Sequence, residues 1–198
     1  MKRVVPLALT AALAFLAVTV WRSQLFTVQK PGDHPHALAV RAAAERATVE
    51  VDAVLPAVPV GMQHLRDKDG VLVIHYWAPW ERDGAAQVTA LDSLAHLPEL
   101  AGLRVAVVCF DPFPSVARYV GRHRLRVPVL LDTEHALRRA LPCPSIPYTY
   151  VLDRAGRIAV AQDGEVDRLS EQTRAGLRSV LKEPAIIEPA RDIPSTTS

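Results

Sequence analysis

Two nearly continuous apolar segments, each followed by a segment with helical spacing, constrain the fold of this chain most strongly. Residues 71–77, VLVIHYW, and residues 103–110, LRVAVVCF, are interrupted only by His75 and Arg104. Strands of this kind are covered on both faces, as in sheets that carry helices on either side. Apolar residues recur at helical spacing in the segments that follow, 82–97 and 114–123. The alternation predicts an α/β fold with helices on both faces of a sheet.

Shorter elements complete this pattern towards the C-terminus. We expect a strand at 128–131, a helix at 134–141, strands at 147–152 and 157–161, and a closing helix at 167–181. The turn segment DRAG joins the last two strands, which predicts an antiparallel hairpin added to an otherwise parallel sheet. Ahead of the first apolar strand we expect a strand at 48–54 and a short helix at 60–66.

The N-terminus carries an apolar run from Val4 to Trp21, preceded by Lys2 and Arg3. Its 18 residues are about the minimum that spans a bilayer as a helix. The run ends without an Ala-x-Ala cleavage site, and a terminal Trp suits an interfacial anchor. We therefore expect residues 1–22 to be an uncleaved signal-anchor that holds the rest of the chain on the extracytoplasmic, periplasmic side of the inner membrane. A cleaved, secreted form is the alternative.

The remaining boundaries follow from composition. Pro and Gly in residues 23–47 predict a tether, with a short helix near 37–47. Residues 48–182 form the expected domain, and residues 183–198, rich in Pro, Ser and Thr, form an expected disordered tail. The content of 49% hydrophobic residues is that of a globular protein, and a net charge of +2 gives no case for nucleic acid binding.

Three local motifs add to the order of elements. They are VLVIHYWAPW at 71–80, VPVLLDTEHALRRAL at 127–141 and SIPYTYVLDRAGRI at 145–158. On these segments the chain resembles the thioredoxin superfamily, and in particular the membrane-tethered TlpA/ResA type of thiol-disulfide oxidoreductase. The resemblance covers about residues 50–182. It implies a thioredoxin-like fold, with a central mixed sheet flanked by helices and preceded here by an N-terminal transmembrane helix.

The resemblance implies a Cys-x-x-Cys pair directly after the second tryptophan, where this chain has Glu81 and Gly84. In such a site a thiolate stabilised by a helix N-terminus attacks a disulfide, and the second cysteine resolves the mixed disulfide. A carboxylate at Glu81 keeps the negative charge that a helix start favours, but it cannot exchange disulfides. Gly84 has no side chain. Whether the chain is an enzyme is therefore open, and we expect a non-catalytic protein.

The same resemblance implies a cis peptide bond before Pro147, on a loop that faces the active-site turn. Such a loop exposes backbone for pairing with an extended chain. An exported protein partner could therefore bind a groove formed by Trp77, Trp80, Ile146, Pro147 and Tyr148. Alternatively, the cis proline serves the fold alone.

His75 lies six residues before Glu81 in the first apolar strand. The resemblance places a buried polar group near the site at this position, and a histidine there could titrate near neutral pH. Alternatively, His75 is a core residue bonded to backbone or water.

The two cysteines are Cys109 and Cys143. Cys109, inside a buried strand, is expected to act as a small hydrophobic residue. Cys143 precedes Pro147 by four residues and is either a lone reactive thiol or a loop residue packed under the turn. We expect no disulfide between them, because the two segments should lie apart. Neither the histidines nor the carboxylates have metal-site spacing, and we expect no metal and no cofactor.

Three functional hypotheses remain. The first is a non-catalytic binding or accessory module for thiol chemistry or envelope protein maturation. The second is a residual oxidoreductase that uses Cys143. The third is a structural accessory of such a maturation complex that has no groove function.

Six arginines between positions 118 and 139 form a basic region: Arg118, Arg122, Arg124, Arg126, Arg138 and Arg139. We expect this region to be a solvated face, or less commonly a contact for anionic lipid or an acidic partner.

Overall fold

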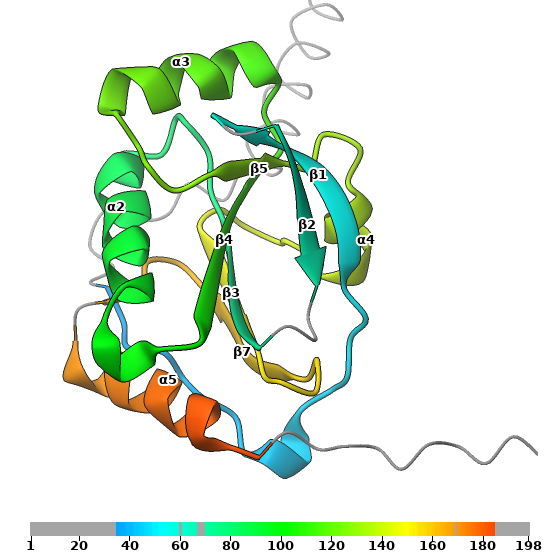
Figure 1. Ribbon diagram of the computed structural model, residues 1–198, viewed down its shortest axis with the longest axis vertical. Coiled ribbons are helices and arrows are strands. Elements are labelled where there is room, and N and C mark those ends of the chain that lie inside the picture. Colours follow the sequence, from blue (N-terminus) through cyan, green and yellow to red (C-terminus); the bar gives the residue numbers. More distant parts are fainter. Residues whose placement is uncertain (1–34, 60, 67–69, 169, 185–198) are drawn as a thin grey trace, which may run out of the picture. The chain divides into compact units, whose positions relative to one another are not determined.

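The computed structural model describes residues 35–59, 61–66, 70–168 and 170–184 (Figure 1). The predicted signal-anchor at 1–22, residues 23–34 of the predicted tether and residues 185–198 of the predicted tail lie outside the described residues. Within the described part, no helix has the length and apolar character needed to cross a bilayer.

Seven strands form one mixed sheet in the order β2-β1-β5-β4-β3-β6-β7. The central strands β3, β4 and β5 are parallel, whereas the β3–β6, β6–β7, β1–β5 and β1–β2 pairs are antiparallel. The predicted final hairpin is therefore confirmed, and a second hairpin extends the opposite edge. The strands are β1 (Asp52–Val58), β2 (Met62–Arg66), β3 (Val71–Tyr76), β4 (Leu103–Cys109), β5 (Val129–Leu131), β6 (Tyr148–Leu152) and β7 (Ile158–Asp163).

Helices cover both faces of this sheet, as predicted. The α-helices are α2 (Gly84–Ala95), α3 (Phe113–His123), α4 (Ala136–Ala140) and α5 (Glu171–Lys182), with 3-10 turns η1 (Ala43–Glu45) and η3 (Pro98–Leu100). Val71 and Val73 of β3 belong to one core cluster with side chains of α2, α3 and α5. Leu72 and Ile74 belong to a second cluster that includes α4. Burial on both faces explains why β3 has an almost unbroken apolar sequence.

In the segment 60–66, predicted as a short helix, residues 62–66 instead form the strand β2. Leu65 is buried, while its neighbours His64 and Arg66 are exposed, which is the period of two of a strand with one face covered. The predicted strand at 48–54 is β1 and lies a few residues further along, at Asp52–Val58.

Residues 35–47, predicted as part of a tether, pack on the domain. The Leu38 amide donates to Thr173 Oγ1 of α5 (3.2 Å), and the Leu38 side chain is buried. The Arg41 amide donates to the carbonyl of Ala159 in β7 (2.8 Å). Backbone bonds to neighbouring elements replace most of the helix expected near 37–47, of which only the turn η1 forms. The folded domain therefore includes residues 35–47.

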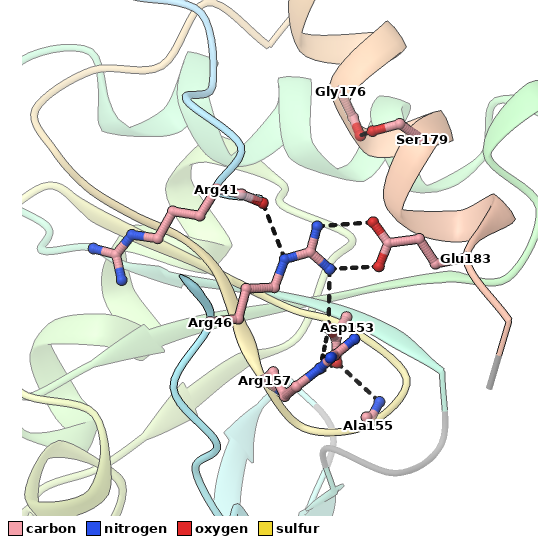
Figure 2. Close-up of polar contacts among 8 residues, drawn as sticks. All are labelled: Arg41, Arg46, Asp153, Ala155, Arg157, Gly176, Ser179 and Glu183. Carbon is pink, nitrogen blue, oxygen red and sulfur yellow. Dashed lines mark hydrogen bonds and ion pairs between the residues drawn. The ribbon is translucent and has the colours of Figure 1, made fainter. Parts of the chain in front are cut away.

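A buried arginine fastens this segment to the C-terminal end of the domain (Figure 2). The Arg46 guanidinium donates to both carboxylate oxygens of Glu183 and to Asp153 Oδ2 (3.0 Å), while Nε donates to the Arg41 carbonyl (3.1 Å). Asp153 also accepts from Arg157 Nε (2.9 Å). Glu183, predicted as the first residue of a disordered tail, is thus part of the folded domain.

Candidate functional site

Two loops meet the sheet at the end where β3 stops and β6 starts. Tyr76 pairs with Tyr148 in the antiparallel β3–β6 ladder, so residues 77–83 and the loop that carries Pro147 leave the same end of the sheet. The Ile146–Pro147 peptide bond is cis, as predicted. Trp80 is 60% exposed, Ile146 and Tyr148 are half-buried, and Pro147 is buried. Trp80, Ile146 and Tyr148 form the candidate site surface, and the predicted groove residue Pro147 is buried beside them.

Trp77 does not line this surface, which corrects the sequence prediction. Its side chain is fully buried and packs edge-on against Tyr119 of α3, with ring centroids 4.9 Å apart. Its indole lies against the backbone of Gly84, where an added Cβ would overlap with Nε1 and lie 3.1 Å from Cε2. The indole therefore occupies the space that a side chain at position 84 would need.

Glu81 lies in the loop just before α2 and is half-buried. Gln87 Nε2 donates to Glu81 Oε1 and to Glu165 Oε1, both at 2.8 Å, so one amide group links two carboxyls. Glu81 Oε2 is buried without a hydrogen-bond partner among the described residues. Burial raises the pKa of Glu81 to about 7, although the bond from Gln87 and the charge of Arg168 oppose this shift. Glu81 thus exchanges a proton near neutrality and is not the constant negative charge expected from the sequence.

His75 is fully buried on β3, between β6 and a buried arginine. Its Nδ1 lies 3.0 Å from Thr149 Oγ1, and its Nε2 lies 3.1 Å from Nη2 of Arg168. Nη2 of Arg168 also lies 3.4 Å from Nδ1, and because the guanidinium can only donate, it donates to the ring nitrogen that carries no proton. Burial and the Arg168 charge hold the pKa of His75 well below its usual value. Of the two alternatives, titration near neutral pH therefore does not hold, and His75 is a buried core residue whose partners are side chains.

Arg168 links this histidine to the carboxyls. It is 5% exposed, and its Nη2 lies 3.4 Å from Gln87 Oε1, so the network runs from Thr149 through His75, Arg168 and Gln87 to Glu81 and Glu165. Burial lowers the pKa of Arg168 to about 10, which leaves it charged at neutral pH. The sequence predicts a role for His75 and Glu81 but not for Arg168, Gln87 and Glu165, because no local pattern connects positions so far apart.

Solved structures with the same arrangement of strands and helices decide the fold. A secreted thiol-disulfide isomerase from Corynebacterium glutamicum matches with a TM-score of 0.61 and 18% identity, over 80% of this chain and 98% of that one. StoA from Bacillus subtilis matches with a TM-score of 0.56 and 16% identity, over 66% and 98% of the two chains. A DsbF homologue from Corynebacterium diphtheriae matches with a TM-score of 0.54 and 22% identity, over 78% and 96%.

The fold is thioredoxin-like. No family model and no curated protein sequence matches the chain. At these identities the likeness shows the thioredoxin-like fold alone, so the chemistry of the site has to follow from its own side chains.

The cysteines of this thioredoxin-like domain are both free and buried. Cys143 donates to the carbonyl of Ser145 (2.9 Å), and burial raises the pKa of its thiol to about 12. Reactive cysteines are exposed and ionise easily, so the features of Cys143 are those of the packed loop residue. Cys109 is part of the core, and the two residues form no disulfide, as predicted.

The described residues contain no group of three or more potential metal ligands. The site therefore presents an exposed tryptophan and a cis-proline loop above a buried network of one cation, one neutral imidazole and two carboxyls. The network can hold and exchange a proton, but it contains no sulfur nucleophile.

Proposed function

We propose that this chain is a membrane-tethered extracytoplasmic thioredoxin-like protein of the TlpA/ResA type that binds segments of exported proteins without exchanging disulfides. Binding occurs on the candidate site surface, around Trp80 and the Ile146–Pro147 bond. The protein would act as a binding or accessory module in thiol chemistry or envelope protein maturation.

The absence of an available thiol supports the non-catalytic part of this proposal. Glu81 and Gly84 stand where the resemblance implies the cysteine pair, and the Trp77 indole fills the space beside Gly84. Cys143 is buried and its thiol has a raised pKa. The residual-oxidoreductase alternative would require Cys143 to leave its packed position before it could attack a disulfide.

The exposure of Trp80 carries the binding part of the proposal. Tryptophan is among the residues that contribute most to protein interfaces. Here a side chain that is 60% exposed lies on the loop that leaves the sheet at the same end as the cis-proline loop. An extended partner segment can pack on Trp80 and hydrogen-bond to the backbone near Pro147.

An array of unfolded segments from exported proteins tests this function. We expect the protein to bind a subset of segments, and Trp80→Ala to weaken that binding about 30-fold, the loss expected for a hot-spot side chain. Met62→Ala is the matched control, because Met62 is 61% exposed on the distant hairpin β1–β2. Equal binding by Trp80→Ala and the unmodified protein would contradict the proposed surface.

Membrane tethering needs its own test. The apolar run Val4–Trp21 behind Lys2 and Arg3 supports it. We expect the full chain to stay in membranes washed at alkaline pH and its domain to be cut by protease added to spheroplasts. A protein released by the wash would favour the cleaved form.

A further inference from the structure

The outer side of α3 and the segment after it form a basic surface. Residues 112–131 contain no Asp or Glu. None of the basic side chains in this stretch has an ion pair with another described residue, and all are exposed; they are Arg118, Arg122, His123, Arg124 and Arg126. We call the four arginines the α3 basic face.

The opposite side of α3 is apolar and packs into the domain. Val116 and Val120 belong to the core cluster under α3. The outer side carries Arg118 and Arg122, and at Gly121 an added Cβ would meet nothing within 4 Å. The helix thus presents an open, cationic outer side.

The α3 basic face has two features that do not favour folding: like charges close together on one helix, and an arginine in the left-handed conformation. Arg118 and Arg122 are four residues apart on one helix, a spacing at which like charges repel. Arg124 adopts the left-handed conformation (φ 51°, ψ 41°) that ends helices most readily with glycine. Sequences break such local preferences mainly at functional sites. The concentration of unpaired arginines is therefore best explained by an anionic partner.

We propose that the α3 basic face docks the domain on anionic phospholipid headgroups of the bilayer that holds the chain. This inference rests on the proposed membrane tether, because the 13 residues between Trp21 and Pro35 span at most about 45 Å and keep the domain near the bilayer. Arginines next to an anionic bilayer each add to binding, and a tethered domain needs only weak affinity because its effective concentration at the surface is high.

Vesicle co-sedimentation tests this docking without the anchor. The described residues from Pro35 onwards belong to one compact unit that contains both core clusters, so the part from residue 35 to residue 198 keeps the whole core and folds on its own. We expect it to bind vesicles of phosphatidylcholine with phosphatidylglycerol, to release them as salt is raised, and to ignore vesicles of phosphatidylcholine alone. The double variant R118E/R122E should bind the anionic vesicles at least tenfold more weakly.

The single variant R122E should also bind the anionic vesicles more weakly than the unmodified domain. R154E is its matched control, because Arg154 is equally an exposed arginine but lies in the β6–β7 turn. It should bind almost as the unmodified domain does. Equal binding to both vesicle types, or unchanged binding by a folded R118E/R122E, would overturn the proposal. Binding to poly-glutamate without binding to anionic vesicles would also overturn the proposal, because it would show that the α3 basic face binds an acidic protein. A full chain found outside membranes would refute the tether but leave the vesicle result for the domain intact.

Discussion

Replacing Gly84 by alanine tests how tightly the region below the candidate site is packed. The new Cβ would overlap with Trp77 Nε1 and lie 3.1 Å from Cε2 and 3.2 Å from Cδ1. The indole cannot simply turn away, because it is fully buried and packs against Tyr119. Adding one methyl group to a filled core typically costs about 1–3 kcal/mol. Alanine regains up to about 1 kcal/mol through its helix propensity, so we expect a net loss of about 1–2 kcal/mol.

Gly121→Ala provides the matched control for this substitution. Gly121 also lies in a helix, but its added Cβ would meet nothing within 4 Å, so we expect a gain of about 0.5–1 kcal/mol. Urea titration followed by tryptophan fluorescence measures both variants, and the midpoint of Gly84→Ala should fall by about 0.5–1 M. A Gly84→Ala variant as stable as Gly121→Ala would refute the claim that Trp77 fills this space.

Three further predictions concern charge, stability and thiol access. Folding raises the pKa of Glu81 from 4.5 to about 7, so its ionisation destabilises the native state as the pH rises through this window. Glu81→Gln cannot ionise, so its unfolding free energy should exceed that of the unmodified protein by an amount that grows from pH 5 to pH 8. A difference that does not change with pH would contradict the raised pKa. Arg46→Ala leaves the buried Asp153 carboxylate with only Arg157 as an ion-pair partner and should cost about 3 kcal/mol in urea unfolding, whereas a loss below about 1 kcal/mol would show that the pair is dispensable. A thiol reagent should label Cys143 only after unfolding, and rapid labelling of the folded protein would restore the oxidoreductase hypothesis.

The elements that the sequence predicted well are those whose burial is uniform along the segment. β3 and β4 lie at the centre of the sheet between layers of helices, so their segments are apolar almost throughout. The cis bond before Pro147 followed from a motif rather than from periodicity. The hairpin strand β2 was missed because the alternation of His64, Leu65 and Arg66 is short enough to resemble a helical pattern.

The rest depends on contacts between distant parts of the chain. Residues 35–47 join the domain through backbone hydrogen bonds and through Arg46, neither of which leaves a periodic pattern in the sequence. The partners of His75 and Glu81 come from β6, α2 and the loop after β7. The burial of Trp77 depends on the absence of a side chain at Gly84, which becomes visible only when the two residues are brought together.

The central claim is that this protein does not exchange disulfides, and an insulin-reduction assay tests it most directly. The assay compares the purified protein with Cys143→Ser, with dithiothreitol as the reductant. The site has a carboxyl at Glu81 and no side chain at Gly84, and the thiols of the chain are buried. The account predicts that both proteins leave the rate at that of dithiothreitol alone. Turnover by the unmodified protein that Cys143→Ser abolishes would contradict it.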